Sequence, residues 1–194
     1  MKLSDYELFL QIIKGDENSL AELILRFQNK VYNTALSYLQ NNEEAEEVAM
    51  DVFLELFQSA ANFRGESSVS TWIYRITINK SLDKLKYRNR KKRLVWISSI
   101  FSNEEGELLH DKPHFEHPGI LLENKEKSVL LFKAIDQLPE KQKSAYLLSY
   151  VEMLPQNEVA QILETSIGAV ESLLQRAKVK LRKELEKYYP ERLR

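Results

Sequence analysis

The chain has 194 residues, of which 43% are hydrophobic and 29% are charged, and its net charge is −1. It contains no cysteine, which excludes disulfides, thiolate nucleophiles and cysteine-ligated zinc or iron–sulfur sites. With only 5 Gly and 5 Pro, it has few of the turn residues that a β protein requires, so an all-α fold is predicted. The sequence shows no apolar signal region and no membrane-spanning run, which predicts a cytoplasmic protein without membrane insertion.

Two amphipathic helices are predicted at the start of the chain. The first follows an N-cap signal at Ser4-Asp5 and ends near Gly15. The second spans about Ser19–Leu39, and Asn41-Asn42 ends it.

The third predicted helix, Glu43–Phe57, is acidic. One apolar stripe runs along it, formed by Ala45, Val48, Val52 and Leu56. Acidic residues occupy its remaining surface, and those in its first turn stabilise the helix by interacting with the positive end of the helix dipole. These acids indicate either a solvated helix face or a docking helix for a basic protein partner, since Phe53 and Leu54 lie beside them.

The stretch from Phe63 to Leu94 is strongly basic. Against two acids, Glu66 and Asp83, it carries ten basic residues: Arg64, Arg75, Lys80, Lys84, Lys86, Arg88, Arg90, Lys91, Lys92 and Arg93. A polar loop, Gly65–Thr71, opens it, and a helix with two faces follows. The face predicted to enter the core carries Tyr74, Ile78, Leu82 and Leu85. The opposite face carries Trp72, Ile76, Asn79, Asp83, Lys86 and Arg90.

A basic helix with aromatic and amide side chains on its wet face suits a phosphate backbone and unstacked bases. A solvated helix end explains the charge run equally well when this segment is considered alone. The chain is acidic before the segment and basic again after residue 165, which favours two separate nucleic-acid contacts.

A non-helical linker is predicted over Val95–Gly119, where serine, proline and glycine interrupt any helical period. All three histidines lie here, His110, His114 and His117. A proline-broken loop gives no fixed ligand geometry, so neither a metal site nor another cofactor is expected.

A second helical unit is predicted from about Leu121. Its first helix is closed by Pro139, and Gln142–Val151 forms another. A short helix, Gln156–Leu163, is followed by a turn at Thr165–Gly168, and then by a long helix that runs through Leu185.

A short helix, a tight turn with glycine and a second helix with a polar first face form a helix-turn-helix. The exposed face of the second helix offers Ser172, Gln175 and Arg176 to a major groove, bordered by Glu171 and Lys178. An ordinary helical hairpin would give the same pattern, but the base-reading side chains favour DNA.

Three segments together resemble the extracytoplasmic-function (ECF, group four) sigma factors of bacterial RNA polymerase, in their two-domain form. They are EEAEEVAMDVFLELF, FRGESSVSTWIYRITINKSLDKLKYRNRKK and LPEKQKSAYLLSYVEMLPQNEVAQILETSIGAVESLLQRAKVKLRKEL. The resemblance covers about Ser19–Leu94 and Asn124–Leu185. It implies sigma region 2 in residues 1–94, a linker in 95–120 and sigma region 4 in 121–194.

The resemblance also implies the residues of each site. Polymerase binding falls to Glu46, Glu47, Asp51 and Phe53. Promoter melting and minus-ten recognition fall to Phe63, Arg64, Trp72, Tyr74, Arg75, Asn79, Lys80, Asp83 and Lys86. Minus-thirty-five recognition falls to Ser166, Glu171, Ser172, Gln175, Arg176 and Lys178.

By resemblance, the partners are core RNA polymerase, promoter DNA as duplex and as melted non-template strand, and an anti-sigma factor. The chain would then be an alternative sigma factor of the kind used in stress responses, with no bond-making chemistry of its own. It departs from the family pattern at Met50, Glu171 and Leu173, and the last two put its minus-thirty-five preference in question. The alternative is a stand-alone helix-turn-helix regulator that binds an operator as a dimer.

Overall fold

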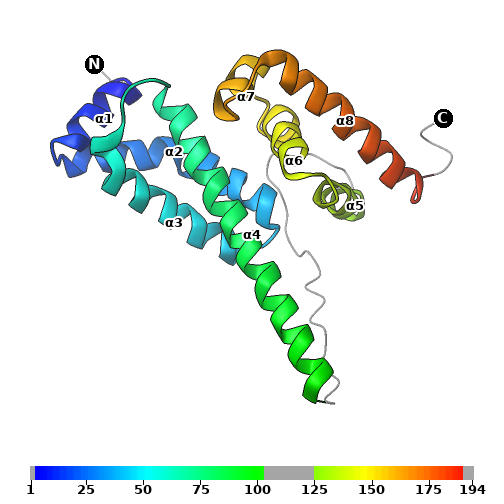
Figure 1. Ribbon diagram of the computed structural model, residues 1–194. Helices are drawn as coiled ribbons and strands as arrows, with labels where there is room; N and C mark the ends of the chain where they lie inside the picture. Colours follow the sequence, from blue (N-terminus) through cyan, green and yellow to red (C-terminus); the bar gives the residue numbers. More distant parts are fainter. Residues whose placement is uncertain (1–2, 103–124, 190–194) are drawn as a thin grey trace.

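The computed structural model describes residues 3–102 and 125–189, and within these ranges it contains helices and no strand. Figure 1 shows the order of the elements. The N-terminal part holds α1 (Asp5–Ile13), α2 (Glu17–Leu39), α3 (Asn42–Ser59), the 3₁₀ turn η1 (Ala60–Asn62) and α4 (Val69–Ser102). The C-terminal part holds α5 (Lys125–Asp136), α6 (Glu140–Tyr146), the π-helical turn η2 (Leu147–Val151), α7 (Gln156–Ile162) and α8 (Ile167–Glu186). The prediction of an all-α chain with two helical domains is confirmed.

Side-chain caps fix where several helices begin. Ser4 caps α1 in a capping box, because its hydroxyl accepts from the Glu7 amide at 3.2 Å and the Glu7 carboxylate accepts from the Ser4 amide at 2.7 Å. Asp16 accepts from the amide of Ser19 at 3.0 Å, so α2 begins two residues before the predicted start. Asn41 caps α3 in the same way, at 2.8 Å from the amide of Glu44.

The N-terminal core lies between α1, α2, α3 and α4. The stripe predicted on α3 is buried in full, and Leu8, Phe9 and Ile12 of α1 join it. From α4 the core receives Ile73, Tyr74, Ile76 and Ile78. Thr77 and Ser81 are also buried, and their hydroxyls donate to the carbonyls four residues earlier at 2.8 and 2.7 Å. These polar groups therefore enter the core with their hydrogen bonds satisfied.

Helix α4 is longer than the sequence indicated. A non-helical stretch was predicted from Val95, but the helix continues to Ser102 and projects beyond the bundle in Figure 1. No glycine or proline occurs between its first and last residues, and serine costs a helix interior only a fraction of a kcal/mol. Residues 103–120, the rest of the predicted linker, lie outside the described residues.

The C-terminal domain packs α5, α6 and α7 against α8, with Phe132, Ile135, Leu148 and Val170 among its fully buried side chains. The helix predicted over Gln142–Val151 changes into the π turn η2, where the amide of Glu152 donates to the carbonyl of Leu147 at 3.0 Å. Such turns widen a helix locally and often occur at functional sites.

Candidate functional site

The outer face of α4 presents most of the residues predicted to contact DNA. Asn79, Asp83 and Lys86 are exposed on it, and Arg75 lies on the same stripe with 29% of its side chain exposed. Ile76, which was placed on this wet face, is buried instead. The helix contacts α1, α2, α3 and α7, so more of its circumference is covered than one stripe of core residues would indicate.

An aromatic cluster of Phe9, Phe63 and Trp72 stands at the start of α4. The ring centroids lie 4.9 Å apart for Phe9–Phe63, 5.3 Å for Phe9–Trp72 and 5.2 Å for Phe63–Trp72. Trp72 is half-buried in this cluster, so only part of the ring remains open to a base. Sequence analysis did not select Phe9, although its position one residue after Leu8 and three before Ile12 is typical of a core residue.

The loop between Phe63 and α4 is held at both ends. The aromatic cluster fixes its start, and the amide of Thr71 donates to the hydroxyl of Ser68 at 3.0 Å at its end. Gly65 has a φ of +71°, a left-handed conformation that glycine adopts without strain. Arg64 is exposed on this loop. The loop therefore places the guanidinium of Arg64 and backbone polar groups next to the aromatic cluster.

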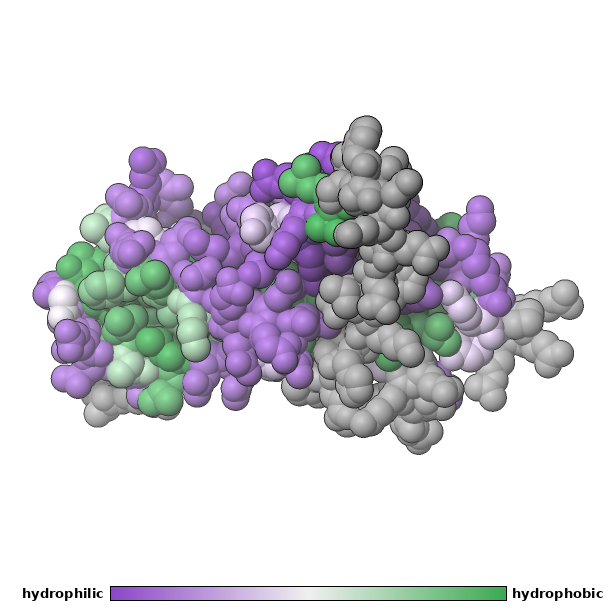
Figure 2. All heavy atoms as spheres, turned by 90° about the horizontal axis from the view of Figure 1, so that it is seen from below, coloured by the Kyte–Doolittle hydropathy of each residue, from purple (hydrophilic) through white to green (hydrophobic). Residues whose placement is uncertain are grey.

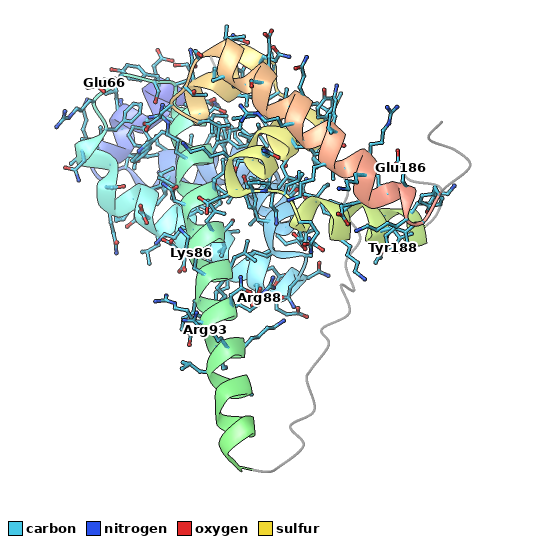
Figure 3. The ribbon with its side chains drawn as sticks, turned by 45° about the vertical axis from the view of Figure 1, so that its right-hand side comes forward. Glu66, Lys86, Arg88, Arg93, Glu186 and Tyr188 are labelled. Atoms are coloured by element: carbon cyan, nitrogen blue, oxygen red, sulfur yellow. The ribbon has the colours of Figure 1, made fainter. Side chains whose placement is uncertain are left out.

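Acidic side chains of α3 pair with basic side chains of α4. Lys84 lies 2.5 Å from Glu47, Lys80 lies 2.7 Å from Glu55 and Arg88 lies 2.9 Å from Glu44. The hydrogen bond that Lys80 donates to the carboxylate of Glu55 raises the pKa of Lys80. Figure 3 shows Lys86 and Arg93 projecting from the part of α4 that leaves the bundle. The exposed positive charge of α4 thus lies toward its C-terminal half.

The outer surface of α3 combines acids with apolar side chains. Glu46, Glu47 and Asp51 are exposed as predicted. Phe53 was expected at the surface, but it is half-buried and packs against the core. The exposed apolar residues are Met50 (74%), Leu54 (55%) and Phe57 (46%), whose spacing of four and three residues could have identified the stripe. Figure 2 shows apolar side chains gathered over the N-terminal bundle, at the left of that view.

The helix-turn-helix is formed by α7 and α8. Ser166 begins α8 as its N-cap, accepting from the amide of Ala169 at 3.2 Å, so this predicted DNA contact also has a structural task. Glu171, Gln175 and Arg176 are exposed on α8, and Ser172 beside them is half-buried. Arg176 donates to the Ser172 hydroxyl at 2.7 Å.

Two predicted DNA contacts, Lys178 and Arg75, have protein partners in this arrangement, and a third, Tyr74, is buried. The ammonium of Lys178 lies 4.8 Å from the centroid of the Tyr150 ring, and the hydrogen bond with Tyr150 raises its pKa. Tyr74 is only 5% exposed, and burial raises the pKa of its hydroxyl. Arg75 pairs with the turn between α7 and α8. Their roles in DNA binding remain predictions.

Among the described residues there is no group of three metal-binding side chains, and the three histidines lie outside those ranges. None of the helices described here is long and apolar enough to span a bilayer.

The comparison with protein families assigns both domains. Residues 23–91 match the family model for Sigma-70 region 2, and residues 128–181 match the model for Sigma-70, region 4. The chain is an ECF sigma factor of RNA polymerase. The resemblance seen in the three sequence segments is thereby confirmed, and the operator-binding dimer is set aside.

Similar proteins extend this result over nearly the whole chain. The RNA polymerase sigma-H factor of Pseudomonas aeruginosa is 28% identical over 185 residues, which are 94% of each chain. The ECF RNA polymerase sigma-E factor of Escherichia coli K12 is 26% identical over 179 residues, covering 91% of this sigma factor and 92% of the relative. This sigma factor is therefore a non-enzymatic subunit that directs polymerase to specific promoters for initiation.

Two solved structures share the fold. CnrH in complex with the cytosolic domain of CnrY superposes with a TM-score of 0.67 at 21% identity, covering 94% of this sigma factor and 97% of CnrH. The Bartonella quintana sigma factor RpoE in complex with the anti-sigma factor NepR gives 0.59 at 18% identity, with coverage of 86% and 96%.

Proposed function

We propose that this sigma factor divides promoter recognition between two faces. The exposed stripe of α4 and the loop Phe63–Ser68 hold the melted non-template strand at the minus-ten element. The first turns of α8 read the minus-thirty-five element as duplex. The observation that carries the proposal is the presence of exposed base-reading side chains, Asn79 on α4 and Gln175 and Arg176 on α8, on faces that the sequence pattern predicts.

Support for strand capture comes from the start of α4. A flipped base needs a stacking surface and a nearby positive charge to offset the unstacking energy, which is on the order of a few kcal/mol. The half-buried ring of Trp72 supplies the surface, and the exposed Arg64 supplies the charge. Asn79, on the same stripe as Trp72, offers an amide that can read a base edge.

Support for duplex reading comes from α8. Arg176 and Gln175 side chains can each bond two atoms of a base edge in the major groove. Glu171 in the first turn can accept from the amino group of a cytosine. The ammonium of Lys178 is held against the Tyr150 ring and not extended toward a base edge. We therefore expect Lys178 to contact a phosphate and so to orient α8 on the duplex.

The surface of α3 supports the proposed polymerase contact. Exposed acids beside Leu54 and Phe57 form a patch in which apolar area gives affinity and charge steers a basic partner. By similarity to the family, that partner is the clamp coiled coil of the largest polymerase subunit. Since polymerase and the chromosome share the bacterial cytoplasm, we assign the protein to that compartment.

An anti-sigma factor is the second protein partner in the proposal. The two solved structures described above each contain a second chain, the cytosolic domain of CnrY in one and the anti-sigma factor NepR in the other. The chemistry of the α3 patch suits such a partner as well as polymerase, so the two would compete for it.

The proposal is tested by run-off transcription with core bacterial polymerase on a pool of genomic fragments, with and without the protein. Discrete start sites that require the protein would identify both promoter elements. On one of these promoters, Asn79→Ala should lower permanganate reactivity of the melted region while polymerase binding is retained. Asn89→Ala, an exposed amide on the same helix but off the stripe, is the matched control. Unchanged reactivity in Asn79→Ala would refute the assignment of α4.

A further inference from the structure

A tyrosine of α1 lies against the loop to which strand capture is assigned above. The ring of Tyr6 is packed over Gly65, because a β-carbon placed on Gly65 would lie 4.0 Å from both the Cε2 and the hydroxyl oxygen of Tyr6. Figure 1 shows the loop passing beside α1 before α4 begins. Tyr6 is nevertheless 52% exposed. An aromatic ring from a helix outside the basic segment is therefore open to solvent at this loop.

Helix α1 brings two aromatic side chains to the loop. Phe9 follows Tyr6 by three residues, a spacing that puts both on one face of the helix. The ring of Phe9 is buried against Phe63 and Trp72, at the start of the loop. Tyr6 contacts Gly65, two residues further along. A single strand that follows the loop from Trp72 therefore meets a second ring at Tyr6.

The first turn of α1 is fixed, so the Tyr6 ring stands on a rigid base. The carboxylate of Asp5 pairs with Arg26 of α2 at 2.7 Å, and the capping box of Ser4 holds the backbone of the same turn. A tyrosine side chain has only two torsions to immobilise, so stacking on a ring with a fixed backbone costs little conformational entropy.

The charges around Tyr6 favour a base over a phosphate. The exposed cation Arg64 precedes Gly65, and the exposed carboxylate Glu66 follows it. On α1, the exposed Glu7 comes directly after Tyr6. These two carboxylates repel a phosphate, whereas a base is uncharged and stacks on an aromatic ring. Tyr6 therefore suits the base of a nucleotide whose phosphate lies toward Arg64.

We propose that Tyr6 stacks on a second unpaired base of the non-template strand, adjacent to the base captured by Trp72 and Arg64. The inference rests on the proposed role of the loop in strand capture and adds a contact from α1, a helix without a predicted DNA-binding residue. A base that stacks on Tyr6 has left the duplex, so α1 takes part in stabilising the opened promoter.

The first test combines a change in the protein with a change in the DNA. Holoenzyme binds forked fragments of a promoter mapped by run-off, in which abasic sites replace the non-template bases of the minus-ten element one at a time. With the wild type, an abasic site should weaken binding at the captured base and at its neighbour. Tyr6→Ala should bind the unmodified fragment about five- to thirtyfold more weakly, which corresponds to about 1–2 kcal/mol of stacking.

The pattern of sensitivity identifies the base that Tyr6 contacts. With Tyr6→Ala, the neighbouring position alone should become insensitive to an abasic site, and Tyr6→Phe, which retains the ring, should match the wild type. Tyr188→Ala is the matched control, because it removes a tyrosine that is 45% exposed at the far end of α8 (Figure 3). Unchanged affinity in Tyr6→Ala would overturn the proposal. So would an equal loss at every abasic position together with a lower urea midpoint, because Tyr6 would then only support the loop.

The second test identifies what contacts position 6 in the open complex. Holoenzyme with Tyr6→p-benzoylphenylalanine should, on irradiation, crosslink to the non-template strand at the base adjacent to the captured one. A crosslink to a polymerase subunit alone would overturn the proposal and would make this part of α1 a protein contact.

The two proposals fail in different ways. If the wild-type protein gives no protein-dependent start sites in run-off transcription, the proposed function fails. If start sites appear and Tyr6→Ala shows the same abasic-site sensitivities as the wild type, only the role of Tyr6 is refuted.

Discussion

Replacing Glu152 by glutamine should strengthen the contact between the two domains at neutral pH. The carboxyl lies at the end of η2, against Thr34 and Lys30 of α2, and its charge acts on the buried hydroxyls of Tyr38 and Tyr74. Burial opposes ionisation there and raises its pKa from 4.5 to about 7, although Lys30 and Thr34 act in the opposite direction. Glutamine keeps the shape of the side chain and removes the charge.

The direction and size of the effect of Glu152→Gln follow from the linkage between protonation of the Glu152 carboxyl and closure of the two domains. The closed state prefers the protonated carboxyl, so its contribution is complete below pH 4.5, decreases as the pH rises, and is lost above about pH 7. A shift of this size corresponds to about 3 kcal/mol at most, since one pKa unit equals 1.36 kcal/mol. At pH 8 the variant should therefore close more favourably by up to about 3 kcal/mol, and at pH 4.5 it should match the wild type.

Energy transfer between two dyes, one on each domain, measures closure of the two domains directly. Asn62→Cys in η1 and Arg182→Cys in α8 place unique labels at exposed positions on the two domains. The urea concentration at which the domains separate is compared for wild type and Glu152→Gln at pH 5 and pH 8, with Glu186→Gln as the charge control. The difference between wild type and Glu152→Gln should grow with pH. A difference that is the same at both values would refute the argument from burial.

Three further predictions concern single side chains. Leu54→Asp, at a position 55% exposed on α3, should weaken binding to core polymerase at least tenfold in a pull-down titration, with the midpoint of urea denaturation unchanged. A lower urea midpoint would mean that Leu54 stabilises the fold. Phe9→Ala removes a fully buried ring from the cluster with Phe63 and Trp72 and should cost about 3–5 kcal/mol in urea denaturation, and a cost below 1 kcal/mol would contradict the packing. Arg176→Ala should cost about 1–3 kcal/mol at one base pair of the upstream element in competition binding, whereas an equal loss on every sequence would make it a phosphate contact.

The helices themselves follow from local rules. The stripe through Val48 and Val52 has the helical period and is buried as predicted. Ser4 was recognised at the start of α1, because a cap depends only on residues three positions apart, whereas Ser166 was assigned to a turn and its capping of α8 was seen only in the structure. The predicted end of α4 was wrong for a local reason as well: the serines after Val95 suggested a break, whereas no glycine or proline occurs before Ser102 and the helix continues to that residue.

Burial on α4 required the tertiary structure. The sequence places Ile76 on the same side as Asn79, and a single buried stripe would leave both exposed. Contacts with several neighbouring helices bury Ile76 at 6% exposure and leave Asn79 in solvent. The prediction that Phe53 is exposed was wrong for the same reason, since a neighbouring helix decides whether a residue at the edge of the buried stripe is covered.

The sequence by itself determined most of the helices, the two helical regions and the family, because period, caps and motif order are properties of neighbouring residues. Only the tertiary structure decided that Arg75 bonds Glu164, that Lys143 bonds the end of α2, and that Glu152 is buried between them. These contacts join residues on different domains, so no local pattern encodes them. They arise from the free energy of two polar surfaces meeting, in which ion pairs offset desolvation only when both surfaces are in place.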